Sequence, residues 1–153
     1  MNTVIESRAA SLQEARAETG VARYVVPVGR VLFAAIFLMT LLGHFSPQVI
    51  GFAAQQGVPL AGLLVPLSGV LAFAGGVSVA LGYRAKLGAW ALVVFLVPVT
   101  LLMHRFWAIE DPLMAQMDQA MFMKNLSMLG GALLLTHVGA GPVSLDARRA
   151  QQS

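Results

Sequence analysis

The sequence predicts an all-α integral membrane protein, an antiparallel four-transmembrane-helix bundle with both termini in the cytoplasm. Hydrophobic residues make up 58% of the 153-residue chain and charged residues only 11%, against about 25% charged in a soluble domain. Leu60–Leu81 and Leu87–Met103 contain no charge. At about 1.5 Å per residue each run can cross a hydrocarbon core of about 30 Å, the second only just. The five-residue turn between them is too short to recross the membrane, so the two runs form a hairpin.

Two further apolar stretches complete the predicted bundle. The expected spans are residues 24–43, 60–81, 87–103 and 121–138. They belong to one membrane domain, residues 24–146, between an N-terminal tail at 1–23 and a C-terminal tail at 147–153. Residues 45–59 and 108–120 are expected to be loops on the side of the membrane opposite to the tails.

The distribution of Lys and Arg gives the orientation. The two tails and the 82–86 turn carry seven of these residues, and the opposite loops carry only Arg105. Because basic residues are retained in the cytoplasm, the tails are predicted to be cytoplasmic. The basic residues lie at membrane boundaries rather than in one patch, which argues against a nucleic-acid partner. The chain has no cysteine, which excludes thiol redox chemistry and cysteine metal sites.

This topology brings several polar groups to the outer leaflet. The candidate ligand-binding residues are His44, His104, Arg105, Trp107, Lys124 and Asn125. Lys124, Ser127 and Gly131 share one helix face, so Lys124 is expected to point into the bundle if that small-residue face packs inward.

Three interpretations of this polar cluster stay open. Each group can lie at the interface with no ligand, as lysine and histidine side chains often do. Alternatively, the cluster forms a pocket roofed by residues 108–120, which binds a quinone or a lipid headgroup. A haem held by His44 and His104 is disfavoured, because both histidines lie at helix ends. No recognisable metal-ligand spacing is present.

At the cytoplasmic ends of the helices, Arg30 is expected to form a structural ion pair with Asp146, or to bind the end of the fourth span. No catalytic motif such as a P-loop, HExxH or a nucleophile elbow occurs in the sequence.

Five short motifs, in this order, resemble those of the DoxX family of small bacterial membrane proteins. They are Gly29-Arg30, Gly75-Gly76 to Gly82-x-Arg84, His104-x-Phe106-Trp107, Phe122-x-Lys124-Asn125-Leu126 and Gly139-x-Gly141-x-x-Ser144-Leu145-Asp146. The resemblance implies a four-helix, multi-pass protein of the bacterial cytoplasmic (inner) membrane. It also implies a link to redox processes, since some members are subunits of quinone-linked oxidoreductases.

Two positions depart from the family pattern. Members often carry a lysine where this chain has His44, and a glutamate where it has Phe73. These departures favour a non-catalytic accessory or scaffold subunit of a larger membrane redox or respiratory-type complex, contacting lipids and either a protein partner or further copies of itself. The alternative is a quinone-binding oxidoreductase component that uses the outer-leaflet pocket. A small-solute transporter is a third hypothesis.

Overall fold

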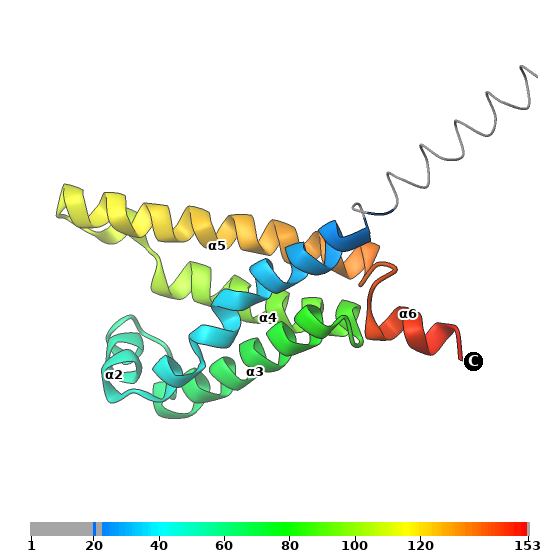
Figure 1. Ribbon diagram of the computed structural model, residues 1–153. Helices are drawn as coiled ribbons and strands as arrows, with labels where there is room; N and C mark the ends of the chain where they lie inside the picture. The colour runs from blue at the N-terminus through cyan, green and yellow to red at the C-terminus, as the bar shows by residue number, and fades with distance from the viewer. Residues whose placement is uncertain (1–19, 21–22, 153) are drawn as a thin grey trace, which may run out of the picture.

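The computed structural model describes residue 20 and residues 23–152, and the regular structure in this part of the chain is entirely helical. A first helix covers residues 23–39. The elements that follow are η1 (Leu41–Phe45), α2 (Pro47–Gln55), α3 (Ala61–Leu81), α4 (Ala85–Met103), η2 (Phe106–Ala108), α5 (Pro112–Val138) and α6 (Leu145–Ala150). The first helix, α3, α4 and α5 are the long elements (Figure 1). Expectations for the N-terminal tail lie almost wholly outside the described residues.

Three helices of the described chain are long and apolar enough to cross a membrane. The first span, Arg23–Phe45, is the first helix together with η1. The second, Ala61–Leu81, is α3, and the third, Ala85–Ala108, is α4 together with η2. The second and third correspond to the two uncharged runs in the sequence, and the turn between them is short as expected. The fourth long helix, α5, has 27 residues and is therefore about 40 Å long. Its charged and polar residues, among them Asp118 and Lys124, keep it out of this apolar class.

Both expected loops contain helix, so these two predictions are wrong. In the first loop Ser46 caps α2, its hydroxyl accepting a hydrogen bond from the Val49 amide, and Pro47 occupies the first turn. In the second loop the Asp111 carboxylate caps α5 in the same way, 2.8 Å from the Met114 amide, and a proline follows. A capping side chain followed by proline starts a helix because it satisfies one free amide and removes another. The fourth long helix therefore begins at Pro112, well before the predicted residue 121.

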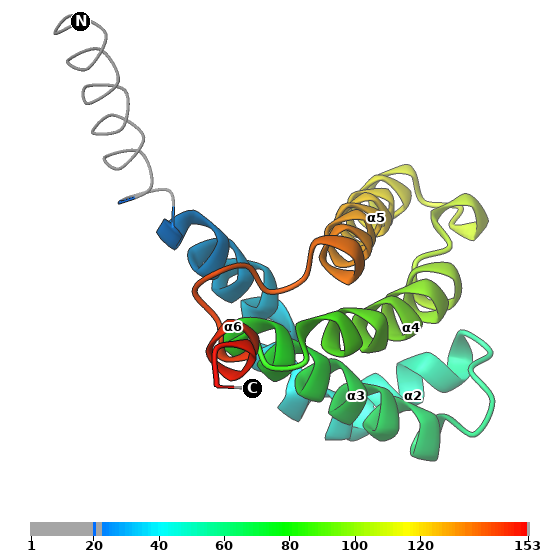
Figure 2. The ribbon, with the colours of Figure 1, turned by 90° about the vertical axis from the view of Figure 1, so that its right-hand side faces the viewer.

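The bundle core lies where the first helix, α3, α4 and α5 meet (Figure 2). Its largest fully buried side chains are Leu92, Leu96 and Val79. Phe37 of the first helix packs edge-on against Phe95 of α4, with ring centroids 6.1 Å apart. The glycine at position 76 of α3 permits this packing, because a Cβ at Gly76 would lie 3.1 Å from the Cβ of Phe37.

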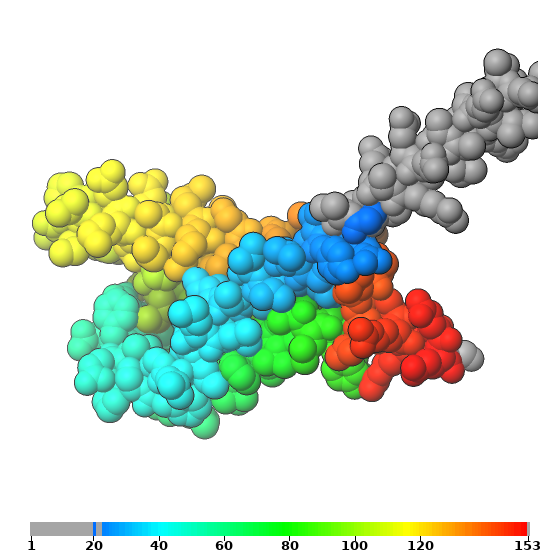
Figure 3. Space-filling model, in the orientation of Figure 1, coloured from blue at the N-terminus to red at the C-terminus, as the bar shows by residue number. Residues whose placement is uncertain are grey.

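The two ends of the bundle differ in how the helices are held. We call the end with Arg30, the 82–84 turn and residues 139–146 the arginine end, and the end with His44, α2 and His104 the histidine end. At the histidine end the start of α5 and the η1–α2 segment form two arms with a recess between them (Figure 3). The arginine end is tied together by hydrogen bonds described below.

Candidate functional site

A cavity of about 480 Å³ lies at the histidine end, lined by residues of α2, α3 and α4. This volume falls within the range of about 300–1,000 Å³ that is usual for ligand sites. Fifteen of its 18 lining residues are apolar, and the polar ones are His44, Ser68 and His104. Two lining side chains, Leu67 and Val94, are 58% and 59% exposed. The cavity therefore borders the apolar outer surface of the bundle.

His44 reaches the cavity because η1 lies directly against α3. A Cβ at Gly69 would be only 2.5 Å from the Cβ of His44, so the imidazole can occupy this place only beside a glycine. The ring also packs on Phe95, with centroids 5.8 Å apart. Its Nδ1 lies 2.9 Å from the Thr40 carbonyl oxygen. These contacts fix the half-buried ring in one orientation.

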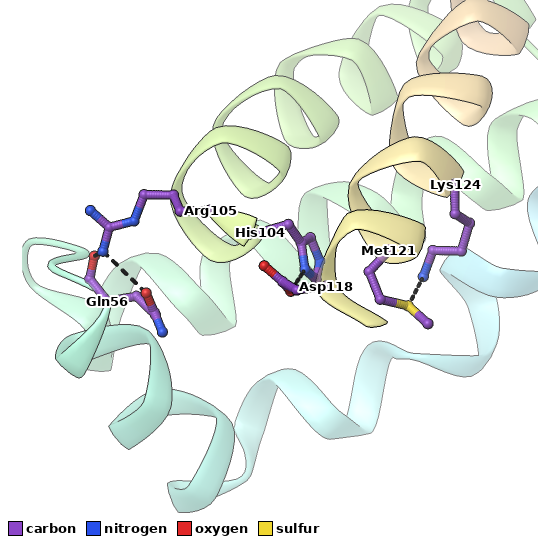
Figure 4. A network of polar contacts seen from close by, with 6 residues as sticks. All are labelled: Gln56, His104, Arg105, Asp118, Met121 and Lys124. Atoms are coloured by element: carbon purple, nitrogen blue, oxygen red, sulfur yellow. Dashed lines mark hydrogen bonds and ion pairs between the residues drawn. The ribbon is translucent and has the colours of Figure 1, made fainter. Parts of the chain in front are cut away.

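His104 lies just after the end of α4 and is held by a residue of α5. Its Nδ1 is 2.8 Å from Oδ1 of Asp118, and both side chains are about four-fifths buried. The pair joins the end of α4 to the first two turns of α5 (Figure 4). The structure thus brings His44 and His104 to the same cavity, as antiparallel topology predicted.

Arg105, the next residue, holds the opposite arm. Its guanidinium donates to the Gln56 backbone carbonyl at 3.0 Å and to the Gln56 side-chain oxygen at 3.1 Å (Figure 4). Gln56 follows the last residue of α2, which carries one wall of the cavity. Two adjacent residues, His104 and Arg105, therefore position α5 and α2 respectively.

The other three candidate residues lie away from the cavity lining. Lys124 is exposed, and its ammonium is 3.4 Å from the Met121 sulfur, so the expectation that it points into the bundle is wrong. The residue that faces inward is its neighbour Asn125, which is 4% exposed. Trp107 is 59% exposed and packs edge-on against Phe122. The side chains of neighbouring helical residues point in directions about 100° apart. Lys124 and Asn125 therefore lie on different faces of α5, and the sequence analysis assigned the inward direction to the wrong one.

At the arginine end, Arg30 and Asp146 do not form the expected direct ion pair. Arg30 is 4% exposed and donates to the backbone carbonyls of Ala140 and Val143, which follow α5. This geometry is closer to the alternative, a contact with the end of the fourth span. The Asp146 carboxylate instead accepts hydrogen bonds from the Arg84 and Ala85 amides, at 2.7 and 3.0 Å, where α4 begins.

Sequence reasoning missed Gln56, Ser68 and Asp118. Gln56 and Asp118 lie in segments that were expected to be loops. Helical periodicity was therefore not used to predict the direction of their side chains. The Ser46-Pro47 and Asp111-Pro112 pairs were the signals that could have revealed both helices. Among the described residues, no group of three or more His, Asp or Glu side chains is placed to hold a metal ion.

Comparison with known proteins identifies a family. The model of the SURF4 family matches residues 3–151. Inner membrane protein YqjF of Escherichia coli (strain K12) is 32% identical over 127 residues, which cover 79% of this chain and 88% of YqjF. ER-derived vesicles protein ERV29 of Saccharomyces cerevisiae is 30% identical over 80 residues, 52% of this chain and 26% of ERV29. No solved structure matches.

These matches correct the sequence analysis on one point and confirm another. The resemblance to the DoxX family is wrong, because the family model that matches nearly the whole chain is that of SURF4. The quoted motifs combine glycines, boundary arginines and interfacial aromatics, which helix packing and membrane anchoring favour in unrelated membrane proteins. The predicted location is confirmed: the chain is a multi-pass protein of the bacterial inner membrane.

Proposed function

The chain belongs to the SURF4 family, and we propose that it is a non-catalytic membrane protein that binds an amphipathic molecule in the cavity at the histidine end. The composition of the cavity carries this proposal. Its largely apolar wall suits an alkyl or isoprenoid chain, and His44 and His104 offer polar atoms for a headgroup. Apolar pockets with a few fixed polar groups are the usual form of small-molecule sites.

The histidine geometry fixes both rings at the cavity. Each imidazole uses Nδ1 in a hydrogen bond that holds the ring in place. None of the comparisons indicates a redox reaction, so a quinone enters this proposal only as one amphipathic ligand of suitable shape. The name of the yeast relative refers to ER-derived vesicles, which agrees with a role in membranes and indicates no chemical step.

The proposal includes a topology. With α5 as the fourth span, the two termini lie on one side of the membrane, and the excess of Lys and Arg in the tails and the 82–86 turn favours the cytoplasmic side. The cavity then belongs to the outer leaflet. Asp118 and Lys124 are accommodated because α5, about 40 Å long, exceeds the hydrocarbon core of about 30 Å.

Photolabelling tests whether the cavity binds a ligand. The full chain, in nanodiscs, is treated with a hexadecanol that carries a diazirine in its tail, and labelled peptides are mapped by mass spectrometry. We expect saturable labelling of the cavity segments of α3 and α4, on top of a linear background from lipid-facing residues.

A matched pair of serine variants makes this test specific. Ser68→Phe fills the cavity, because Ser68 lines it, and should reduce the saturable labelling about tenfold. Ser127→Phe is the control: its hydroxyl also bonds a backbone carbonyl of its own helix, and it lies exposed on α5. Labelling that is linear in probe concentration, or equal in the two variants, would refute ligand binding.

A second candidate function is an accessory or scaffold subunit of a larger membrane complex, or a homo-oligomer. The observation that favours it is an exposed row on the first half of α5, where Met114, Met117 and Met121 are 57%, 57% and 43% exposed. Flexible methionine side chains suit adaptable protein contacts. Native mass spectrometry of the protein extracted from its own membrane tests this, and a lone monomer would contradict it.

A further inference from the structure

The hydrogen-bond partner of His44 determines which ring nitrogen carries a proton. Nδ1 lies 2.9 Å from the Thr40 carbonyl oxygen, and a carbonyl oxygen can only accept. Nδ1 must therefore be the donor. In a neutral imidazole the other nitrogen, Nε2, then has a lone pair and no hydrogen. Because the partner is backbone, no change of a neighbouring side chain reverses this assignment.

His104 has the same arrangement for a different reason. Its Nδ1 is 2.8 Å from a carboxylate oxygen of Asp118, and an ionised carboxylate is an acceptor only. The neutral ring again carries its proton on Nδ1 and presents Nε2 as an acceptor. The two imidazoles that line the cavity thus both offer hydrogen-bond acceptors at Nε2.

The remaining polar residue of the cavity lining already uses its donor within its own helix. The third polar lining residue, Ser68, donates its hydroxyl hydrogen to the Val65 carbonyl at 2.8 Å. The nearby cations lie outside the lining: Arg105 donates through one terminal nitrogen to Gln56, with its buried Nε unpartnered, and Lys124 is exposed beside Met121. The cavity wall therefore provides acceptors for a headgroup and no cation for an anionic one.

From this arrangement we infer that the cavity takes an amphipathic molecule whose headgroup donates a hydrogen bond, that is, a hydroxyl-headed lipid such as a long-chain alcohol or an alkylated phenol or hydroquinone. A quinone, an ether or an ester presents only hydrogen-bond acceptors. Its oxygens would face the Nε2 lone pairs of His44 and His104 and form no hydrogen bond with them. A phosphate headgroup brings negative charge to a wall without a cation. This inference rests on the proposed function and names the ligand class of the same site. It argues against the quinone that the sequence analysis considered as a ligand of this pocket.

Two pairs of competitors test the headgroup directly. Dodecanol and dodecyl methyl ether share a tail, as do para-dodecylphenol and its methyl ether, and in each pair only the first can donate. Each competes against the diazirine probe in nanodiscs at one mildly alkaline pH. Concentrations are expressed relative to lipid, so that differences in partitioning do not enter the comparison.

We expect the hydroxyl compound to compete about three- to tenfold more strongly than its ether, the usual effect of one neutral hydrogen bond. A preference in only the aliphatic pair identifies an alcohol as the source of the hydroxyl group, and one in only the aromatic pair identifies a phenol or hydroquinone. Equal competition in both pairs, or a preference for the ethers, overturns the inference and leaves ligand binding intact. Absence of saturable labelling refutes the proposed function and this inference with it.

A histidine variant assigns the preference to the ring. His44→Phe keeps an aromatic ring of similar shape and removes Nε2, so the ratio between alcohol and ether should fall toward one while saturable labelling persists. His137→Phe is the matched control, because His137 is exposed near the end of α5, away from the cavity lining. If the preference survives both His44→Phe and His104→Phe, the two imidazoles do not select the ligand and the inference fails.

Discussion

Replacing Arg30 by methionine should lower the free energy of unfolding by about 2–4 kcal/mol. Arg30 is 4% exposed and binds the backbone carbonyls of Ala140 and Val143. A hydrogen bond to a charged group contributes about 1.5–3 kcal/mol, so losing two costs about 3–6 kcal/mol. Methionine also removes a buried charge whose Nε has no hydrogen-bond partner, which returns part of that cost.

The assay is SDS-induced unfolding in mixed micelles, followed by the fluorescence of Trp90 and Trp107. Arg23→Met is the control, since Arg23 is exposed on the same helix and bonds only its neighbour Tyr24 in the described structure. Its effect should stay within about 0.5 kcal/mol. Arg30→Lys should fall between the two, because a lysine ammonium reaches fewer acceptors than a guanidinium fork. Equal stability of the Arg30→Met and Arg23→Met proteins would refute the view that this arginine fastens the helix ends.

Three further predictions concern other contacts. Asp146→Asn should cost about 1 kcal/mol in the same unfolding assay, because the amide oxygen replaces only one of two acceptors at the start of α4; no change would show that the cap is dispensable. Gly69→Ala should weaken saturable photolabelling, because the added methyl group forces the His44 side chain and the cavity wall to shift, whereas unchanged labelling would place the ligand elsewhere. Asp118→Leu should speed amide hydrogen exchange in residues 106–120 and not in α2, and Arg105→Leu should do the reverse; the same pattern in both variants would contradict the separate roles of the two contacts.

The helical hairpin at the centre of the fold could be predicted because its signal is local. Two long uncharged runs and a short polar turn leave little choice of structure, and α3 and α4 lie within two residues of those runs. The helix at 47–55 and the first part of α5, residues 112–120, were missed because neither segment has the long apolar run by which hydropathy reveals a helix. Their capping pairs do reveal them, and a search for Ser-Pro and Asp-Pro would have found both.

The candidate site was predictable only to the level of topology. Antiparallel helices bring His44 and His104 to one end whatever the side chains do, and the structure places them on one cavity. Which side of α5 faces inward depends on packing against α4 and the first helix, which the sequence does not report. The partners Asp118 and Gln56 depend in turn on helices that were not expected.

The exposure of Leu67 and Val94 at the border of the cavity affects how a ligand would be supplied. A molecule entering past these side chains comes from the bilayer, so its relevant concentration is its mole fraction among lipids and not its level in water. Strong partitioning of an alkyl chain raises that mole fraction, since each buried methylene favours the apolar phase by about 0.8 kcal/mol. A weak intrinsic affinity is then enough for high occupancy. Because every phospholipid offers a similar tail, discrimination depends on the headgroup alone.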